Sequence, residues 1–401
     1  MARMPDNATR ACLPLNSNSA GQGLLLTTLA MLALGVIIVY AAMARPVMRE
    51  DVAWHSRTDM RHALFAAISC LALLALWKLD YRRLTGRGKF PVAAGIGLGL
   101  SVACSLLIFV PGMGQEVGGY VRWLKIAPGV GFQPSELVKF AVLIFLAAWL
   151  TKQHRNHRSF FKTFVPAMLI TGLAVGVTIK QDFSTGAVVA MAAMVTLLLA
   201  GVPWYYLLMV IPPAIAGFYK YVYADPYRWN RILAWLDPYS SNPCAYQARE
   251  SLIAILTGGW AGKGLGRGTT YLGYLPESST DFVFSAYCEQ LGFAGALLLI
   301  GLMLLWMWNA RKAALRAADR FGYVLAGSLG FLIAVQAVMH VAVALVSAPT
   351  TGQGLPFVSA GGTSLVMSAA AAAVMISVSA RGQSDQELSA ANGLPAIAAA
   401  A

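Results

Sequence analysis

Apolar residues run along this chain in long stretches that short polar segments separate. The first stretch is Leu24–Ala42, and further ones are centred near residues 70, 100, 143, 172, 193, 212, 294, 333 and 368. About 20 consecutive apolar residues in a helix cross the hydrocarbon core of a bilayer. The pattern therefore predicts an all-α polytopic membrane protein with about ten transmembrane helices.

Polar residues interrupt this pattern for longest between residues 222 and 280, which predicts a large extracytoplasmic loop between helices 7 and 8. The flanking segments predict a cytoplasmic tail over residues 1–21, a transmembrane domain over 22–380 and a disordered tail over 381–401. Compact basic clusters, which favour the cytoplasmic side of a membrane, read RRLTGRGK, KQHRNHR and RKAALRAADR. Placing them inside puts the long loop outside.

The composition agrees with membrane insertion. Of the 401 residues 58% are hydrophobic and 12% charged, whereas soluble domains carry about 25% charged residues. The net charge of +13 is explained by cytoplasmic basic loops and by anionic lipid head groups, so it does not indicate nucleic-acid binding. The five cysteines show no metal-ligand spacing.

Two carboxylates stand where the long loop ends. Glu277 and Asp281 are four residues apart, and Asp281 directly precedes the next apolar stretch. A carboxylate at such a low-dielectric boundary tends to have a raised pKa, as a general base at neutral pH requires. The alternative is that Asp281 merely caps the following helix.

The segment QPSELVK, which ends at Lys139, predicts a helix start with a cation about one turn inside the bilayer. Ionisable groups at that depth are expensive and usually functional. The alternative is a local ion pair, because Glu136 and Lys139 are three residues apart and share a helix face. Arg122, a short distance upstream, is a candidate clamp for a phosphate.

Further candidates lie on either side of the predicted eighth helix. Arg228 and Arg231 are spaced to face one side of a short helix, and the glycines between 258 and 268 favour a re-entrant or close-packed loop over a nucleotide-binding loop. Asp182 is typical of an N-cap. His340, inside an apolar stretch, favours a hydrogen-bonding helix contact over a titrating group.

Proline and glycine punctuate the segment PTTGQGLPFVSAGGTS, residues 349–364, which contains Ser359. Irregular backbone between two membrane spans is tolerated where it is buried in protein or lines a wet cavity. This segment therefore predicts the wall of a site.

Taken in order, these motifs resemble the SEDS membrane glycosyltransferases, the FtsW/RodA/SpoVE group. The resemblance covers about residues 20–380 and is carried by Arg122-Trp123 with QPSELVK, QDFSTG, YRWNRILAWLDP, GGWAGKGLG, YLPESSTDFVF and PTTGQGLPFVSAGGTS. It implies ten transmembrane helices, location in the bacterial inner membrane, and polymerisation of lipid II into peptidoglycan for division or shape maintenance. It also implies a class B penicillin-binding protein as partner.

The family's essential aspartate falls on Asp281 in this sequence. The resemblance implies that Asp281, with Glu277 nearby, deprotonates the acceptor 4-hydroxyl, which attacks the anomeric carbon of the donor with inversion. The substrate-binding candidates are Arg122, Lys139, Arg228, Arg231 and Ser359. A divalent cation could share the pyrophosphate charge, although no acidic cluster requires one and no metal ligand is assigned.

Four positions depart from the family's pattern: Gly273, Ser279, His340 and Ala360. They keep two alternatives open. One is a flippase for lipid II or a similar polyprenyl-linked sugar, although only one proline-glycine interruption is present and transporters often use paired ones. The other is a non-catalytic scaffold for a penicillin-binding protein.

Overall fold

A computed structural model describes residues 18–42, 57–86, 88, 90–117, 120–127, 130–153, 158–268 and 274–391. The departure at Gly273 lies outside the described residues, as do most of the two tails. The helices are α1 (Ser19–Ala42), α2 (Thr58–Leu76), α3 (Val92–Leu107), α4 (Pro134–Lys152), α5 (Val165–Gln181), α6 (Phe183–Leu199), α7 (Ile211–Phe218), α8 (Pro226–Leu236), α9 (Ala245–Gly258), α10 (Val283–Leu315), α11 (Arg320–Ala344) and α12 (Gly362–Ala391).

The prediction of a polytopic helical membrane protein is confirmed. Seven helices in the described part of the chain are long and apolar enough to cross a bilayer, and two shorter apolar helices are α3 and α6. The segment Trp204–Tyr223 forms one further span if it is taken together with α8, from which it is bent by 92°. The number ten and the placement of the long loop stay predictions.

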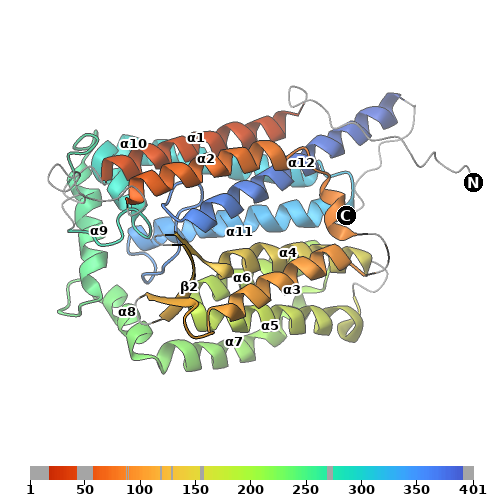
Figure 1. Cartoon of the computed structure of the whole chain (residues 1–401), viewed down its shortest axis with the longest axis horizontal. Coiled ribbons are helices and arrows are strands. Elements are labelled where there is room, and N and C mark those ends of the chain that lie inside the picture. Colours follow the sequence, from red (N-terminus) through yellow and green to blue (C-terminus); the bar gives the residue numbers. More distant parts are fainter. Residues whose placement is uncertain are drawn as a thin grey trace, which may run out of the picture.

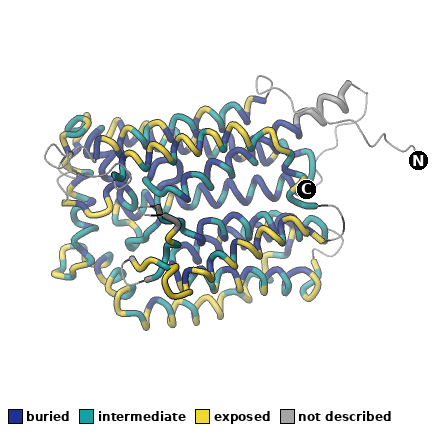
Figure 2. Tube along the Cα trace, viewed as in Figure 1, coloured by how far each residue is buried: buried dark blue, intermediate teal, exposed yellow. Residues whose placement is uncertain are grey.

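The helices run side by side along the long axis of the molecule, with α11 in the middle of the bundle (Figure 1). Helix α11 packs against α4 and α6 on one side and against α10 and α12 on the other. Burial is concentrated along these central helices, whereas outer helices carry exposed positions (Figure 2). No residue of α7 is buried.

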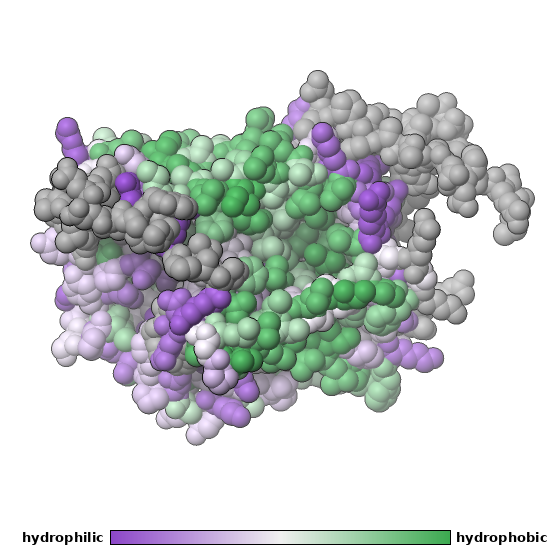
Figure 3. Space-filling model, in the orientation of Figure 1, coloured by the Kyte–Doolittle hydropathy of each residue, from purple (hydrophilic) through white to green (hydrophobic). Residues whose placement is uncertain are grey.

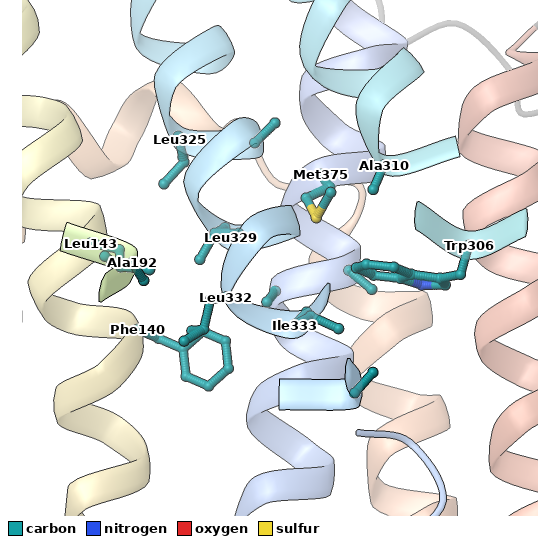
Figure 4. Packing of buried hydrophobic residues seen from close by; sticks show 14 of the residues in the cluster. Phe140, Leu143, Ala192, Trp306, Ala310, Leu325, Leu329, Leu332, Ile333 and Met375 are labelled. Carbon is teal, nitrogen blue, oxygen red and sulfur yellow. The ribbon is translucent and has the colours of Figure 1, made fainter. Parts of the chain in front are cut away.

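Close packing of branched and aromatic side chains holds the centre together. Leu329, Leu332 and Ile333 of α11 lie between Phe140 of α4 and Trp306 of α10 (Figure 4). The indole of Trp306 also donates to the hydroxyl of Thr28 over 3.0 Å, which satisfies its one polar atom inside the bundle. The face seen in Figure 3 is mainly apolar across the middle and more polar towards both ends, as a bilayer requires.

The start of α1 and the far part of α12 lie at the same end of the bundle. The hydroxyl of Ser379 donates to Asn18 over 2.8 Å, and Arg316 bonds Ser19 over 2.8 Å. Helices that begin and end on one side of a bilayer imply an even number of crossings. Helix α12 continues to Ala391, beyond Arg381, where the sequence predicts a disordered tail to begin.

A three-stranded antiparallel sheet joins α3 to α4. Its strands are β1 (Gly114–Val117), β2 (Tyr120–Ala127) and β3 (Val130–Phe132), in the order β1-β2-β3. The sheet lies at the end of the bundle where α8 and α9 cross it (Figure 1). The predicted loop over residues 222–280 therefore contains two helices, and β2 places Arg122 near them.

Helix α10 is broken at Gly292, where φ is 66° and ψ is −164°. The glycine-rich segment after α9 fills the break: Phe293 N donates to Gly259 O over 2.8 Å, and Lys263 N donates to Glu289 O over 3.0 Å. Lys263 Nζ also pairs with the fully buried Glu289 carboxylate at 2.8 Å. The prediction of a close-packed glycine loop is confirmed, and the loop anchors the half of α10 that follows Asp281.

We expect Gly292→Ala to destabilise the protein by about 2–4 kcal/mol, because the φ is left-handed and the new Cβ would meet backbone. That Cβ would clash with Gly262 N and would lie 2.6 Å from Trp260 O. The measurement is thermal unfolding in detergent. The matched control is Gly301→Ala in the same helix, where a Cβ meets nothing within 4 Å; equal melting temperatures for both variants would contradict the prediction.

Candidate functional site

Two cavities meet at Gly352 and Gln353, at the end of the bundle that carries the sheet. The larger has a volume of about 230 Å³ and lies among α6, α8, α11 and the segment 349–353. The smaller, of about 100 Å³, lies among α4, α11 and the segments 280–281 and 352–361. The segment 349–364 was predicted to form a site wall, and its residues line both cavities.

Strand β2 contributes one residue to each cavity. Arg122 lines the larger cavity and Trp123 the smaller one. The register of β2 against β1 shifts between Val121 and Trp123, and strand β2 borders both cavities.

The larger cavity is basic. Arg122, Arg228 and Arg231 line it, and Asp182 is its one acidic residue. Arg228 and Arg231 come from one side of α8, as predicted. Their orientation is fixed: Arg228 Nη1 donates to Tyr221 O over 2.8 Å, and Arg231 Nη2 donates to the hydroxyl of Tyr227 over 2.7 Å.

Much of the remaining wall of the larger cavity is apolar, formed by residues such as Met191, Phe218, Val222, Ile232 and Met339. A cavity that combines three guanidinium groups with apolar walls suits a ligand that has an anionic group joined to a lipid chain. Phe218 belongs to α7, the helix with no buried residue.

Asp281 lines the smaller cavity. It does not cap the following helix: α10 begins after Phe282 and has no side-chain cap, so the alternative interpretation of Asp281 is wrong. Asp182, in contrast, is the N-cap of α6, as predicted, because its carboxylate accepts from Ser184 N and Thr185 N. The Asp281 carboxylate is therefore available for chemistry.

The pKa of Asp281 is raised to about 7, and burial away from water is the main cause. The negative charges of Glu277 and Asp182 raise this pKa further, whereas the positive charges of Arg231 and Arg122 lower it. A carboxyl group with this pKa exists in both protonation states near neutral pH, which suits a general base.

Gly352 brings groups from three elements together. A Cβ placed there would lie 3.6 Å from Arg122 Nη1, 3.6 Å from Asp281 Oδ2 and 4.0 Å from Asp182 Oδ2. The Asp281 carboxylate of the smaller cavity is thus adjacent to the guanidinium groups of the larger one. Glycine keeps this junction free of side-chain atoms.

The turn that carries Asp281 is held from two directions. Ser359 Oγ donates to Thr280 O over 2.7 Å and accepts from Leu355 N over 2.7 Å. Ser359 lines the smaller cavity, but its hydroxyl hydrogen is engaged in positioning this turn. Glu277, with a φ of 56°, is exposed and accepts from the Thr280 hydroxyl over 2.7 Å; it lines neither cavity.

Lys139 and Glu136 form a buried ion pair at the floor of the smaller cavity. Their Nζ–Oε1 distance is 2.8 Å, and the side chains are 1% and 7% exposed. The pairing was predicted, and both residues line the cavity with Asp281. Glu136 Oε2 is buried and has no hydrogen-bond partner among the described residues.

Within the described residues, no group of three His, Cys, Asp or Glu side chains could hold a metal ion. The described cysteines, Cys70, Cys104, Cys244 and Cys288, are free.

Sequence reasoning did not single out several residues that build the site. Gln353 lies in both cavity walls, and Trp123 and Gln336 line the smaller one. Trp123 and Gln353 stand inside motifs that were quoted, but their types carry no obvious chemistry. Gln336 could have been found as a polar residue in the middle of a span.

The family model described as "Cell cycle protein", FTSW_RODA_SPOVE, matches residues 22–384. The chain is 34% identical over 351 residues to a "Probable peptidoglycan glycosyltransferase FtsW" of Geobacter sp. (strain M18), covering 86% of this chain and 93% of that protein. It is 32% identical to "Stage V sporulation protein E" of Bacillus subtilis (strain 168), covering 89% and 96%.

Solved structures share the fold. The crystal structure of Thermus thermophilus "Rod shape determining protein RodA" matches with a TM-score of 0.63 and 25% identity, covering 89% of this chain and 95% of that one. A chain described under "Structural coordination of polymerization and crosslinking by a peptidoglycan synthase complex" matches with a TM-score of 0.71 and 26% identity, covering 89% and 97%.

We expect Lys139→Met to destabilise the protein by about 3–5 kcal/mol, because it leaves the Glu136 carboxylate buried without its cation. The double variant Glu136→Gln with Lys139→Met should recover much of this loss, since it removes the uncompensated charge. Thermal unfolding in detergent provides the measurement. A double variant no more stable than Lys139→Met alone would show that the pair is not coupled.

Proposed function

The chain belongs to the FtsW/RodA/SpoVE family, and from that premise we propose that it polymerises lipid II with Asp281 as the general base. It is a multi-pass peptidoglycan glycosyltransferase of the bacterial inner membrane. The observation that carries the proposed mechanism is the position of Asp281, whose pKa is about 7, beside a cavity lined by three arginines.

The larger cavity suits the donor. Its guanidinium groups, from Arg122, Arg228 and Arg231, would hold the pyrophosphate, and its apolar walls would hold the first part of the polyprenyl chain. Fixed cations also stabilise the negative charge that develops on the leaving pyrophosphate in the transition state. Such oriented charge lowers the barrier without a rearrangement at the moment of reaction.

The smaller cavity suits the acceptor sugar. The acceptor 4-hydroxyl would give its proton to the Asp281 carboxylate while its oxygen forms a bond to the anomeric carbon of the donor. The bond between that carbon and the pyrophosphate oxygen breaks, and undecaprenyl pyrophosphate leaves with the electron pair. Attack from the side opposite the leaving group inverts the configuration at the anomeric carbon.

Lys139 and Glu136 would then orient the acceptor. Their pair is buried, both residues line the smaller cavity, and Glu136 Oε2 has no hydrogen-bond partner among the described residues. In this assignment Arg122, Arg228 and Arg231 carry the charge of the pyrophosphate. A divalent cation, if one takes part, would come with the substrate, because no metal-holding group is present among the described residues.

The partner we propose is a class B penicillin-binding protein. The chain resembles one that was solved in a peptidoglycan synthase complex described as coordinating polymerization and crosslinking. A polymerase needs a transpeptidase to crosslink the strands that it makes, so the two activities belong together. An assay of glycan-strand formation by the purified protein from lipid II separates polymerisation from the flippase and scaffold alternatives, because neither alternative yields glycan strands.

We expect Asp281→Asn to reduce glycan polymerisation by about 10²–10⁴-fold, the typical contribution of a general base. The measurement is the amount of glycan strands formed by the purified protein from lipid II in detergent. Glu250→Gln is the matched control, because Glu250 lies on α9 and lines neither cavity. Strand synthesis by Asp281→Asn at the parent rate would refute the assignment.

The pH dependence follows from the raised pKa of Asp281. Because the carboxylate is the active form, kcat/KM should rise with pH up to about 7 and level off above it. At lower pH each unit should reduce the rate about tenfold, since kcat/KM reports groups of the free enzyme. Initial rates measured from pH 5 to 9 test this, and a profile flat across pH 7 would contradict it.

A further inference from the structure

His340 connects the two segments that build the site. It lies on α11, is fully buried, and lines neither cavity itself. Its Nδ1 bonds Gln353 O at 2.9 Å, in the wall that both cavities share. Its Nε2 accepts from Phe284 N over 3.4 Å, in the first turn of the helix that follows Asp281.

These two partners fix the chemical state of the imidazole. A backbone carbonyl can only accept, so Nδ1 carries the proton, and a backbone N–H can only donate, so Nε2 carries the lone pair. A single neutral tautomer satisfies both bonds. The contact predicted for His340 is therefore confirmed and involves two segments at once.

Both partners need such a bond. The N–H of Phe284 belongs to the first turn of α10, where no carbonyl of the same helix can accept from it. Gln353 O lies in an irregular segment next to a cavity. An imidazole between them satisfies two backbone groups and sets the separation of the two segments.

From Gln353 the network continues to the basic cavity. Gln353 Nε2 donates to Thr185 Oγ1 over 2.6 Å, and this hydroxyl donates to Asp182 Oδ2 over 3.1 Å. Gln336 Nε2 donates to Gln353 Oε1 over 3.2 Å. The side chain of Gln353 is thus fixed from both ends, and His340 holds its backbone.

We propose that His340 is a positioning residue for the transfer reaction, which sets the distance between the Asp281 turn and the wall at Gly352 and Gln353. The inference rests on the proposed function. It follows from the geometry, because Gly352 of that wall lies against both Asp281 and Arg122, and a shift of either segment changes how the base faces the donor.

A displacement of about 1 Å can reduce a rate by about 100-fold without weakening substrate binding. We therefore expect His340→Leu, which removes both bonds, to lower kcat by about 10–100-fold while KM stays within about twofold. His340→Asn retains a donor near the Nδ1 position, and His340→Gln retains an acceptor near Nε2. Each conservative variant should recover part of kcat.

The control is Ser328→Ala. Ser328 is a fully buried polar residue of the same helix, and its hydroxyl donates only to Val324 O, one turn earlier. Because Ser328→Ala removes a buried hydroxyl that contacts neither segment of the site, this variant should keep the parental kcat. Rates are measured on the folded fraction from size exclusion, with lipid II in detergent.

A parental kcat in His340→Leu overturns the inference, as does an equal loss in Ser328→Ala or an effect confined to KM. If His340→Leu does not fold, His340→Asn and His340→Gln provide the test. A parental kcat in both of these variants overturns the inference. Absence of strand synthesis by the parent protein would instead refute the proposed function. The two failures are thus distinguishable.

Discussion

Partial burial of the Asp281 carboxylate is the interaction to which the other parts of this site relate. Burial raises its pKa, and Arg231 and Arg122 oppose that rise by supplying positive charge nearby. The negative charges of Glu277 and Asp182 add to the rise. Charges from separate elements of the fold therefore act on this one carboxyl group.

The loop that carries Asp281 is accordingly held by well-packed neighbouring segments. The half-helix after Asp281 is anchored by the glycine segment that fills the break at Gly292. Ser359 ties the preceding turn to the segment 355–359. Helix α7, in contrast, has no buried residue, so the side of the larger cavity that it borders depends least on core packing. The segments around Asp281 are thus held by hydrogen bonds and close packing, whereas α7 contributes no buried side chain.

The sequence predicts the scaffold and the charged residues well, because hydrophobic periodicity and intramembrane charge are strong local signals. The ion pair of Glu136 and Lys139 and the cap at Asp182 were foreseen from spacing of three residues or fewer. The division of the site into two cavities was not, because it depends on contacts between residues far apart in the chain. Gln353 meets Thr185 across 168 positions, and no local pattern encodes that contact.

The positions where this chain departs from its family's pattern differ in whether main-chain or side-chain atoms make their contacts. Ser279 and Ala360 meet through the backbone, where Ala360 N donates to Ser279 O over 2.9 Å. A contact between main-chain atoms persists when either side chain changes, so these two departures leave the position of the Asp281 turn intact. His340 differs, because its side chain makes the contacts. Among the described departures, the one that we propose bears on the reaction is therefore His340, which is buried on α11, lines neither cavity and yet bonds the wall at Gln353.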